Sequence, residues 1–313
     1  MEHGAAHLGT RLRQWAAALA AALAPAILLA LLAPASSASA AVASCSVSSS
    51  GIVFSSYNTQ TRAAVDGTGT ITVTCTGDGS NNSLSLNLTG GNNDSCGPRQ
   101  MRSGTRTLAY DIFQNAGRTT YFCDGGARLD FNFDFSGAST QTRTFTMYAR
   151  MSSAQNPAYG AYSDGLTIVL KRGGGTLATG TFSVTAPVTP ICSVTAGSLG
   201  FGPYTAAAAT LAVAAVSVNC SSGGTYQVSL GAGANASGGT RRMAGPASSY
   251  LSYQLFRDSA RTLAWGDGTA LGARVSGTGS GAAQTLTVYG RIPAGQSVAA
   301  GSYADSVLVP VEY

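Results

Sequence analysis

The residues whose type and spacing most clearly predict chemistry are the cysteines, and that chemistry is disulfide formation. The six cysteines are Cys45, Cys75, Cys96, Cys123, Cys192 and Cys220. An even number of cysteines in an exported chain is typical of a disulfide framework, because an oxidising compartment keeps thiols paired. Six cysteines allow many pairings, so their count alone does not say which bonds form.

Other common catalytic chemistry finds little support in the sequence. Both histidines, His3 and His7, lie in the first forty residues, which we expect to be removed. A Ser-His-Asp site, a Cys-His site and histidine ligation of zinc are then excluded. Acidic residues lie mainly beside glycine or serine in turn-like sequences, as do Asp78, Asp94, Asp124 and Asp267. Turn positions are favoured over paired catalytic carboxylates, so we expect no enzyme, no cofactor and no metal.

The first forty residues have the organisation of a secretory signal peptide. Arg11 and Arg13 precede an apolar run over 15–33, and Ala-Ser-Ala at 38–40 is a small-residue cleavage site. We therefore predict a signal peptide at 1–40 and a secreted chain that passes through the periplasm. The sequence VASC at 42–45 also resembles a lipoprotein cleavage box. Lipidation of Cys45 is the alternative, although it would leave Cys75 without its expected partner.

The charge pattern argues against nucleic-acid binding. The formal net charge is +5, but the arginines are scattered along the chain and form no patch with interleaved aromatic residues. Electrostatic binding to phosphates needs clustered cations. The short basic stretch 99–102 is interpreted as a solvated turn.

An internal repeat selects among the disulfide pairings. CSVSSSGIVFSSY begins at Cys45 and CSVTAGSLGFGPY begins at Cys192, and a second cysteine follows each at a similar distance. Each copy is therefore expected to join its own first and second strands. The predicted bonds are Cys45 with Cys75, Cys192 with Cys220, and, as the remaining pair, Cys96 with Cys123.

The repeat extends through the rest of the chain and predicts two copies of one all-β domain. The matching segments are LAYDIFQNAGRT (108–119) with LSYQLFRDSART (251–262), RTFTMYARM (143–151) with QTLTVYGRI (284–292), and GAYSDGLTIVL (160–170) with GSYADSVLVPVEY (301–313). Short stretches of alternating apolar residues separated by Gly, Asn, Ser and Asp predict antiparallel sandwiches. The expected division is a domain at 41–186, a linker at 187–191 and a domain at 192–313. The alanine-rich stretch 205–216 is interpreted as a loop leading into a strand.

The two copies differ at their last strand. In the first copy the chain turns at Gly173–Gly175 and continues into 179–185, where Phe182 and Val184 alternate with smaller residues. The sequence of the second copy offers no such strand after Tyr313. We expect an open edge over an apolar groove, which is a site for a strand from a partner. Pro310 suits a position near a sheet margin. The predicted groove residues are Leu199, Phe201, Val307, Val309, Val311 and Tyr313.

The repeated unit resembles the spore coat protein U domain, which is found in pilins of the archaic chaperone-usher pili. The resemblance rests on the CSV start, the second cysteine, the LxYxLF-type central strand and the final GxYxDxVxVxVxY, and it covers essentially the whole expected mature chain. It implies two tandem immunoglobulin-like sandwiches, the second lacking its last strand. It also implies three partners, namely a periplasmic chaperone that lends a strand, an outer-membrane usher, and an adjacent pilus subunit that donates its N-terminal extension.

The N-terminal end predicts the place of the subunit in a fibre. Only residues 41–44 precede Cys45 after the expected cleavage, whereas a donor arm needs about ten extended residues. We therefore expect a tip subunit, with the first copy as an adhesive head for an abiotic or host surface and a role in adhesion or biofilm formation. The disulfide present only in the first copy is expected to brace its loops. The candidate surface-binding residues are Tyr121, Phe122, Pro157 and Tyr159.

A second class of function is compatible with the same sequence. A secreted carbohydrate-binding or hydrolytic sandwich, or an outer-coat structural protein that is not assembled into pili, would have a similar composition. The two classes differ in one property. A pilus subunit is expected to aggregate or self-associate without its chaperone, whereas the alternative is expected to be a stable monomer.

Overall fold

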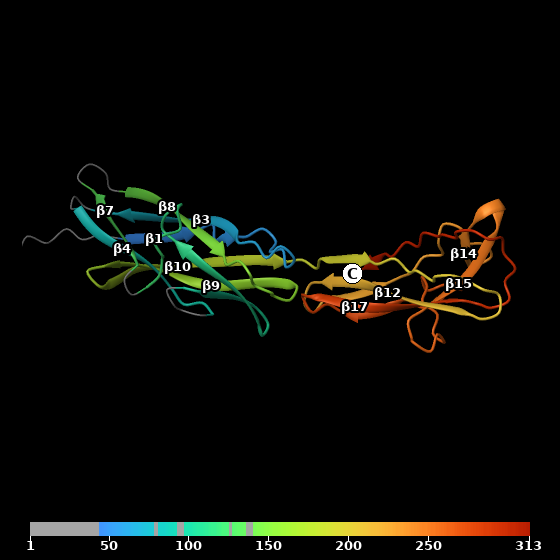
Figure 1. Cartoon of the computed structure of the whole chain (residues 1–313). Coiled ribbons are helices and arrows are strands. Elements are labelled where there is room, and N and C mark those ends of the chain that lie inside the picture. Colours follow the sequence, from blue (N-terminus) through green and yellow to red (C-terminus); the bar gives the residue numbers. More distant parts are fainter. Residues whose placement is uncertain (1–43, 78–80, 93–96, 125–126, 136–139) are drawn as a thin grey trace, which may run out of the picture. The chain divides into compact units, whose positions relative to one another are not determined.

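The computed structural model describes residues 44–313 with the exception of 78–80, 93–96, 125–126 and 136–139 (Figure 1). The predicted signal peptide and Cys96 lie outside the described residues. The described part is all-β, with a single short 3-10 turn, η1 (Pro246–Ser248). None of its helical segments has the length and apolar character needed to cross a membrane.

Ten strands between residues 44 and 188 form the first sandwich. They are β1 (Ser44–Ser49), β2 (Ile52–Val53), β3 (Val65–Thr76), β4 (Asn81–Thr89), β5 (Arg99–Ser103), β6 (Arg106–Phe113), β7 (Leu129–Asp134), β8 (Thr140–Met151), β9 (Gly160–Arg172) and β10 (Gly175–Val188). The order is β1-β3-β8-β6-β5-β9-β10-β2, and β4 pairs with both β7 and β9. The strand β10 therefore lies between β9, which it pairs antiparallel, and β2, which it pairs parallel.

Eight strands between residues 192 and 312 form the second sandwich. They are β11 (Cys192–Ala196), β12 (Thr210–Cys220), β13 (Thr225–Val228), β14 (Arg241–Ala244), β15 (Tyr250–Phe256), β16 (Val275–Thr278), β17 (Ala283–Ile292) and β18 (Val311–Glu312). One sheet has the order β11-β12-β17-β15-β14 and the other the order β16-β13-β18. Among the described residues of this sandwich, no strand occupies the place that β10 takes in the first. The two-sandwich all-β architecture confirms the predicted fold class.

Alternating side chains build the core of each sandwich. In the first, Leu84, Leu86 and Leu88 of β4 are buried together with Phe131 and Phe133 of β7, because a period of two places every second residue on one face. In the second, the indole of Trp265 is 1% exposed. Its Nε1–H donates to the Val228 carbonyl at 3.0 Å, and this bond satisfies the polar end of a fully buried ring.

The stretch 205–216 follows the prediction of a loop that leads into a strand, since β12 begins at Thr210. The stretch 99–102 does not follow its prediction, because it forms strand β5 and Arg99 is only 2% exposed. The guanidinium of Arg99 donates to the carbonyls of Leu88 and Gly90. These bonds satisfy the buried cation, which a solvated turn would have left in water.

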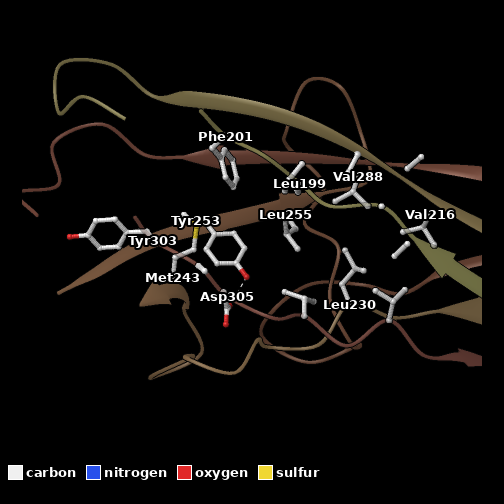
Figure 2. A pocket seen from close by; sticks show the side chains of 17 residues that line it. Leu199, Phe201, Val216, Leu230, Met243, Tyr253, Leu255, Val288, Tyr303 and Asp305 are labelled. Carbon is white, nitrogen blue, oxygen red and sulfur yellow. Dashed lines mark hydrogen bonds between the residues drawn. The ribbon is translucent and has the colours of Figure 1, made fainter. Parts of the chain in front are cut away.

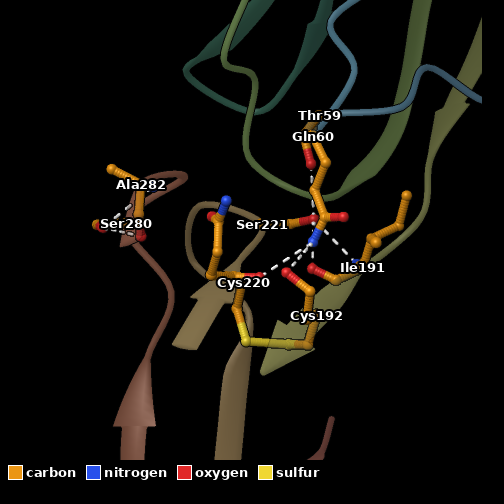
Figure 3. Close-up of a disulfide and its surroundings, with 10 residues drawn as sticks. Thr59, Gln60, Ile191, Cys192, Cys220, Ser221, Ser280 and Ala282 are labelled. Atoms are coloured by element: carbon orange, nitrogen blue, oxygen red, sulfur yellow. Dashed lines mark hydrogen bonds between the residues drawn. A yellow bond between two sulfur atoms is a disulfide. The ribbon is translucent and has the colours of Figure 1, made fainter. Parts of the chain in front are cut away.

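The structure contains two of the predicted disulfides. Cys45 of β1 lies opposite Cys75 of β3 and bonds to it, and Cys192 of β11 lies opposite Cys220 of β12 in the same way (Figure 3). Each bond closes a loop and, on the chain-entropy account, stabilises the folded chain by about 3 kcal/mol because it restricts the unfolded chain. The third predicted bond involves Cys96, which is not among the described residues.

Candidate strand-binding groove

An open groove of about 300 Å³ lies over the core of the second sandwich (Figure 2). The side chains that line it are mainly apolar, and they come from segments that are far apart in the sequence. The principal lining residues are Leu199, Phe201, Val216, Leu230, Met243, Tyr253, Leu255, Val288, Val307 and Val309. An apolar concavity of this kind is favourable for a partner that brings apolar side chains of its own.

Two extended segments form the rims of the groove. We call residues 198–201 the first rim and residues 305–310 the second rim. In the first rim, Leu199 and Phe201 are half-buried while the glycines between and beside them are exposed. In the second rim, Val307 and Val309 are half-buried, whereas Leu308 between them is 76% exposed. Both rims thus present alternate side chains to the groove, as strands do.

The backbone of the second rim is hydrogen-bonded on one side. The carbonyls of Ser306, Leu308 and Pro310 accept from the backbone N–H groups of Ala234, Gly231 and Ser229, respectively, at 2.9 to 3.1 Å. Because N–H and C=O of one residue lie on the same side of an antiparallel strand, the polar groups of the intervening residues face the other way, toward the groove.

The groove side of both rims is unpaired. Within the described part of the chain, the backbone groups of Val307, Val309, Leu199 and Phe201 make no backbone hydrogen bond. An extended segment with a free row of N–H and C=O groups is a template for pairing with another strand. The groove therefore offers two such templates that flank one apolar floor.

A satisfied polar pair lies within the groove. Tyr253 Oη donates to Asp305 Oδ2 at 2.7 Å, and the other carboxylate oxygen accepts from the backbone N–H and Nδ2 of Asn235 at 3.2 and 3.1 Å. Burial, reinforced by the bond to Asp305, raises the pKa of Tyr253 above its ordinary value. The phenol therefore stays a hydrogen-bond donor, and the carboxylate keeps its partners without help from a ligand.

The equivalent place in the first sandwich is filled by β10. Its Phe182 and Val184 are fully buried, as are Ile52 and Phe54 on one side and Leu166 on the other. The backbone pairs on both sides as well, since β10 has β9 along one edge. Along the other edge, the N–H of Phe54 donates to the Thr185 carbonyl at 2.9 Å. The first sandwich is thus the closed form of the geometry that the second leaves open.

The comparison with known families agrees with the repeat. The spore coat protein U domain matches residues 31–169 and again residues 178–310. The chain belongs to the spore coat protein U domain family. Protein U of Myxococcus xanthus is 34% identical over 154 residues, which are 44% of this chain and 85% of that protein.

The solved structures that match this chain have low sequence identity to it. One is the pre-assembly complex of a chaperone with a tip adhesion subunit from the archaic chaperone-usher Csu pili of Acinetobacter baumannii. The match is 18% identical, covers 75% of this chain and 85% of that chain, and has a TM-score of 0.49. Another is the CupB6 tip adhesin of Pseudomonas aeruginosa, at 10% identity, 85% and 93% coverage and a TM-score of 0.37.

Four of the six predicted groove residues of the second spore coat U domain line the groove, namely Leu199, Phe201, Val307 and Val309. Val311 belongs to β18, pairs with Val228 of β13 and packs against the core. Tyr313 is 62% exposed and borders a separate shallow hollow beside Thr225 and Glu312.

Sequence reasoning did not find the floor of the groove. Leu230 follows the end of β13, Met243 lies on β14 and Tyr253 lies on β15, so no local pattern joins them. The repeat carries a usable signal, because Met243 and Tyr253 stand where the first spore coat U domain has the buried Met101 and Tyr110.

The four candidate surface-binding residues do not share one environment. Tyr121 is 43% exposed and its ring stacks on Phe113 with 5.0 Å between centroids, and Tyr159 is also exposed. Phe122 is buried in the core, and Pro157 is buried as well. A buried side chain cannot reach a surface, so the prediction is wrong for Phe122 and Pro157. Tyr121 and Tyr159 remain candidates.

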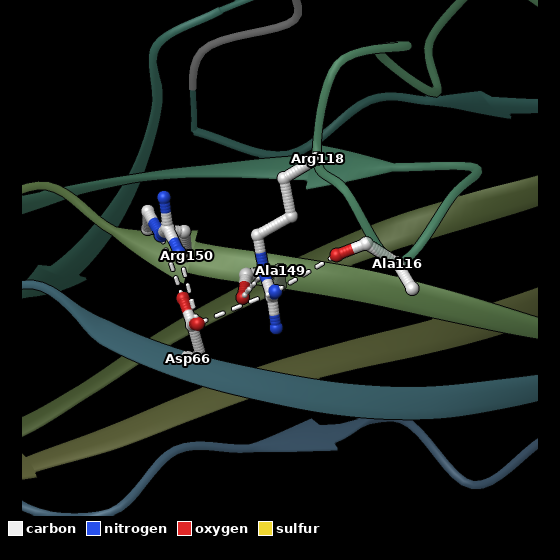
Figure 4. A network of polar contacts seen from close by, with 5 residues as sticks. All are labelled: Asp66, Ala116, Arg118, Ala149 and Arg150. Atoms are coloured by element: carbon white, nitrogen blue, oxygen red, sulfur yellow. Dashed lines mark hydrogen bonds and ion pairs between the residues drawn. The ribbon is translucent and has the colours of Figure 1, made fainter.

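A charged network lies on the outer face of the first spore coat U domain (Figure 4). Asp66 of β3 accepts from Arg150 of β8 at 2.7 and 3.0 Å and forms an ion pair with Arg118 at 3.3 Å. The hydrogen bond from Arg150 is the main cause that holds the pKa of Asp66 below its ordinary value. In the second domain, the residue opposite Arg291 at the corresponding ladder position is Leu211, which is exposed. The network therefore belongs to the first domain alone.

Proposed function

We propose that this protein is a subunit of a chaperone-usher pilus and that its second domain binds a β-strand supplied by a partner. The observation that supports this most strongly is the open groove between two rims whose groove sides are unpaired. Strand addition fits both of its features, because main-chain hydrogen bonds give affinity along the free edges and apolar pockets receive alternate side chains.

The proposed partners would cover this groove at each stage of export and assembly. An unpaired edge over an exposed apolar floor favours aggregation. We infer that a periplasmic chaperone supplies a strand after export, that an outer-membrane usher receives the complex, and that an adjacent subunit then donates the permanent strand. The signal peptide predicted at 1–40 is consistent with this route.

The first domain is assigned a different role within the same proposal. Its own β10 fills the place that is open in the second domain, so the described part of the first domain offers no equivalent site for a partner strand. We assign it as the adhesive head at 41–186, joined through 187–191 to the connector at 192–313, with the subunit at the pilus tip on the cell surface. Tyr121 and Tyr159 are the exposed aromatic residues offered for contact with an abiotic or host surface in adhesion or biofilm formation.

The proposal is tested by two neighbouring substitutions on opposite faces of the second rim. Val309→Asp places a carboxylate in the groove, whereas Leu308→Asp places the same charge on the exposed face. The tagged chain is produced in the periplasm of its native host, and co-purifying proteins are identified by mass spectrometry. The unmodified chain and Leu308→Asp are expected to retain an immunoglobulin-like chaperone, and Val309→Asp is expected to lose at least about nine-tenths of it.

The fluorescence of Trp265 provides the folding control. Trp15 lies in the predicted signal peptide, so Trp265 reports on the second domain in the exported chain. An unchanged emission maximum shows that Val309→Asp has folded. A stable monomer that retains no chaperone would contradict the proposal and would favour a secreted coat or carbohydrate-binding protein. Equal chaperone retention by both variants would contradict the placement of the strand.

A further inference from the structure

The two spore coat U domains can be aligned residue by residue along the edge that receives the last strand. In the first domain this edge is β9, and in the second it is the segment 301–313. The core-facing pairs are Tyr162 with Tyr303, Asp164 with Asp305, Leu166 with Val307, Ile168 with Val309, and Leu170 with Val311.

Side-chain contacts support the same alignment independently of the sequence. Tyr110 Oη donates to Asp164 Oδ2 at 2.7 Å, and Tyr253 Oη donates to Asp305 Oδ2 at 2.7 Å. The buried guanidinium of Arg99 donates to the carbonyls of Leu88 and Gly90, and that of Arg241 donates to the carbonyls of Leu230 and Gly231. The polar framework around the groove is thus duplicated, so β9 and the second rim occupy equivalent places.

The register of β10 on β9 then gives the order of side chains that closes such a groove. The core-facing partners are Ala186 opposite Tyr162, Val184 opposite Asp164, Phe182 opposite Leu166, Gly180 opposite Ile168, and Ala178 opposite Leu170. Phe182, Val184 and Ala186 are buried, whereas the alternating Thr181 and Ser183 are exposed. The strand therefore contributes one large ring between smaller residues.

Gly180 is small for a physical reason. A Cβ built at this position would lie 2.8 Å from Val47 Cγ2 and 3.2 Å from the Val47 carbonyl oxygen. Both distances are shorter than ordinary van der Waals contact. Val47 of β1 pairs with Val73 of β3, and Val194 of β11 pairs with Val218 of β12 in the same register beside the disulfide. The same obstruction is therefore expected opposite Val309.

Three lining residues of the groove are smaller in the second domain than their counterparts in the first. Val307 and Val309 replace the larger Leu166 and Ile168, and the floor residue Val288 replaces Met147. Each replacement removes volume from the wall and leaves the groove open. Ala214, which also lines the groove, takes the ladder position that Gly69 has in the first domain and adds one methyl group, so the lining is smaller at three positions and larger at one.

We propose that the groove selects a strand whose core-facing side chains follow the order of β10, from small through glycine and a large aromatic ring to a β-branched residue and a second small residue. The strand runs antiparallel to the second rim and parallel to the first, with glycine opposite Val309 and the ring opposite Val307. This inference rests on the proposed function, because it takes the groove to be a site for a partner strand. It adds which strands fit and in which register.

The chain provides its own probe for this inference. Residues 173–188, GGGTLATGTFSVTAPV, follow Arg172 in the first domain, and Arg172 aligns with Tyr313. Adding this sequence directly behind Tyr313 of the full chain places a copy of the β9–β10 hairpin over the groove in the predicted register. The unfolding transition of Trp265 is then measured by fluorescence on heating.

The added strand is expected to raise the Trp265 transition by about 10 °C or more, since it buries several apolar side chains on a small domain. Gly180→Val within the added copy is expected to remove at least about half of this rise, and Phe182→Ala a similar share. Ser183→Ala within the copy is the matched control, because this side chain faces solvent, and it is expected to keep the full rise. A copy with the same composition in scrambled order is expected to give none.

Two results would overturn the inference, and they leave the proposed function separately testable. An equal rise from the scrambled copy, or no loss from Gly180→Val, would show that the groove does not select this order. If the added strand has no effect while chaperone retention still depends on Val309, the strand order is wrong and the pilus proposal stands. If the extended chain does not fold, free peptides of residues 176–188 with the same substitutions, added to the unmodified chain, give the same comparison through the Trp265 transition.

Discussion

Tyr253 Oη lies 2.7 Å from Asp305 Oδ2 and donates a hydrogen bond across the groove of the second domain. The bond joins β15 to the second rim, so it holds one edge of the groove against its floor. Tyr110 and Asp164 make the same contact in the first domain, where β10 covers it. The same hydrogen bond is thus present in the closed sandwich of the first domain and in the open sandwich of the second.

Removing this hydroxyl should destabilise only the domain that contains it. Tyr253→Phe leaves the carboxylate of Asp305 without one partner, at a cost of about 1 to 2 kcal/mol. We expect a lower urea midpoint in the Trp265 fluorescence transition. Tyr110→Phe is the matched control, because it removes the equivalent bond in the first domain and should leave the Trp265 transition in place. A shift of that transition by both variants would show that the two domains unfold as one unit.

The disulfide of the second domain is expected to stabilise that domain alone. Replacing both Cys192 and Cys220 by Ser removes the bond between β11 and β12, and the free energy of unfolding should fall by about 3 kcal/mol. The fall is measured from urea unfolding followed by Trp265 fluorescence. The corresponding double substitution at Cys45 and Cys75 should leave this transition unchanged. An unchanged midpoint without the Cys192–Cys220 bond would contradict the prediction.

The charged network of the first domain predicts a pH dependence of known sign. The pKa of Asp66 is lowered mainly by its hydrogen bond to Arg150. A carboxyl whose pKa is lower in the folded chain stabilises it at pH values above the unfolded pKa of about 4, and this contribution is lost as the pH falls through the folded value. Asp66→Asn should therefore lower the urea midpoint at pH 7, by less than about half a molar because the pair is exposed.

The difference between Asp66→Asn and the unmodified chain should shrink steadily as the pH falls below about 4. Far-UV circular dichroism measures this difference, because the network lies in the first domain and Trp265 reports only on the second. Asp130→Asn is the control, since Asp130 forms an ion pair with Arg128 in which both side chains are more exposed than Asp66. A difference for Asp66→Asn that stays constant down to pH 3 would contradict the assignment.

The sequence predicted those parts of the fold that depend on local pattern and on the repeat. Alternation over 84–88 and 131–135 marked buried strand faces, and the two CSV segments marked the Cys45–Cys75 and Cys192–Cys220 bonds. The alternating residues lie within a few positions of one another, and the CSV segments recur at matching places in the two copies. They therefore need no knowledge of how distant segments meet.

The features that the sequence did not predict depend on distant segments. Arg99 is buried because the carbonyls of Leu88 and Gly90 lie within its reach, and nothing in the stretch 99–102 indicates those acceptors. Tyr121 and Phe122 are adjacent, yet one is exposed and the other is buried. Outside a regular strand, the face that each side chain takes is decided by the segment on which it packs, so alternation gives no guide.

The central claim is that the groove side of the second rim is unpaired until a partner strand binds. Amide hydrogen exchange at Val307 and Val309, measured in the isolated chain and again with the β10 copy behind Tyr313, tests it most directly. We predict fast exchange at both amides in the isolated chain and a slowing of at least about a hundredfold with the added strand. Strong protection of these two amides in the isolated monomer would show that the edge is already paired and would contradict the account.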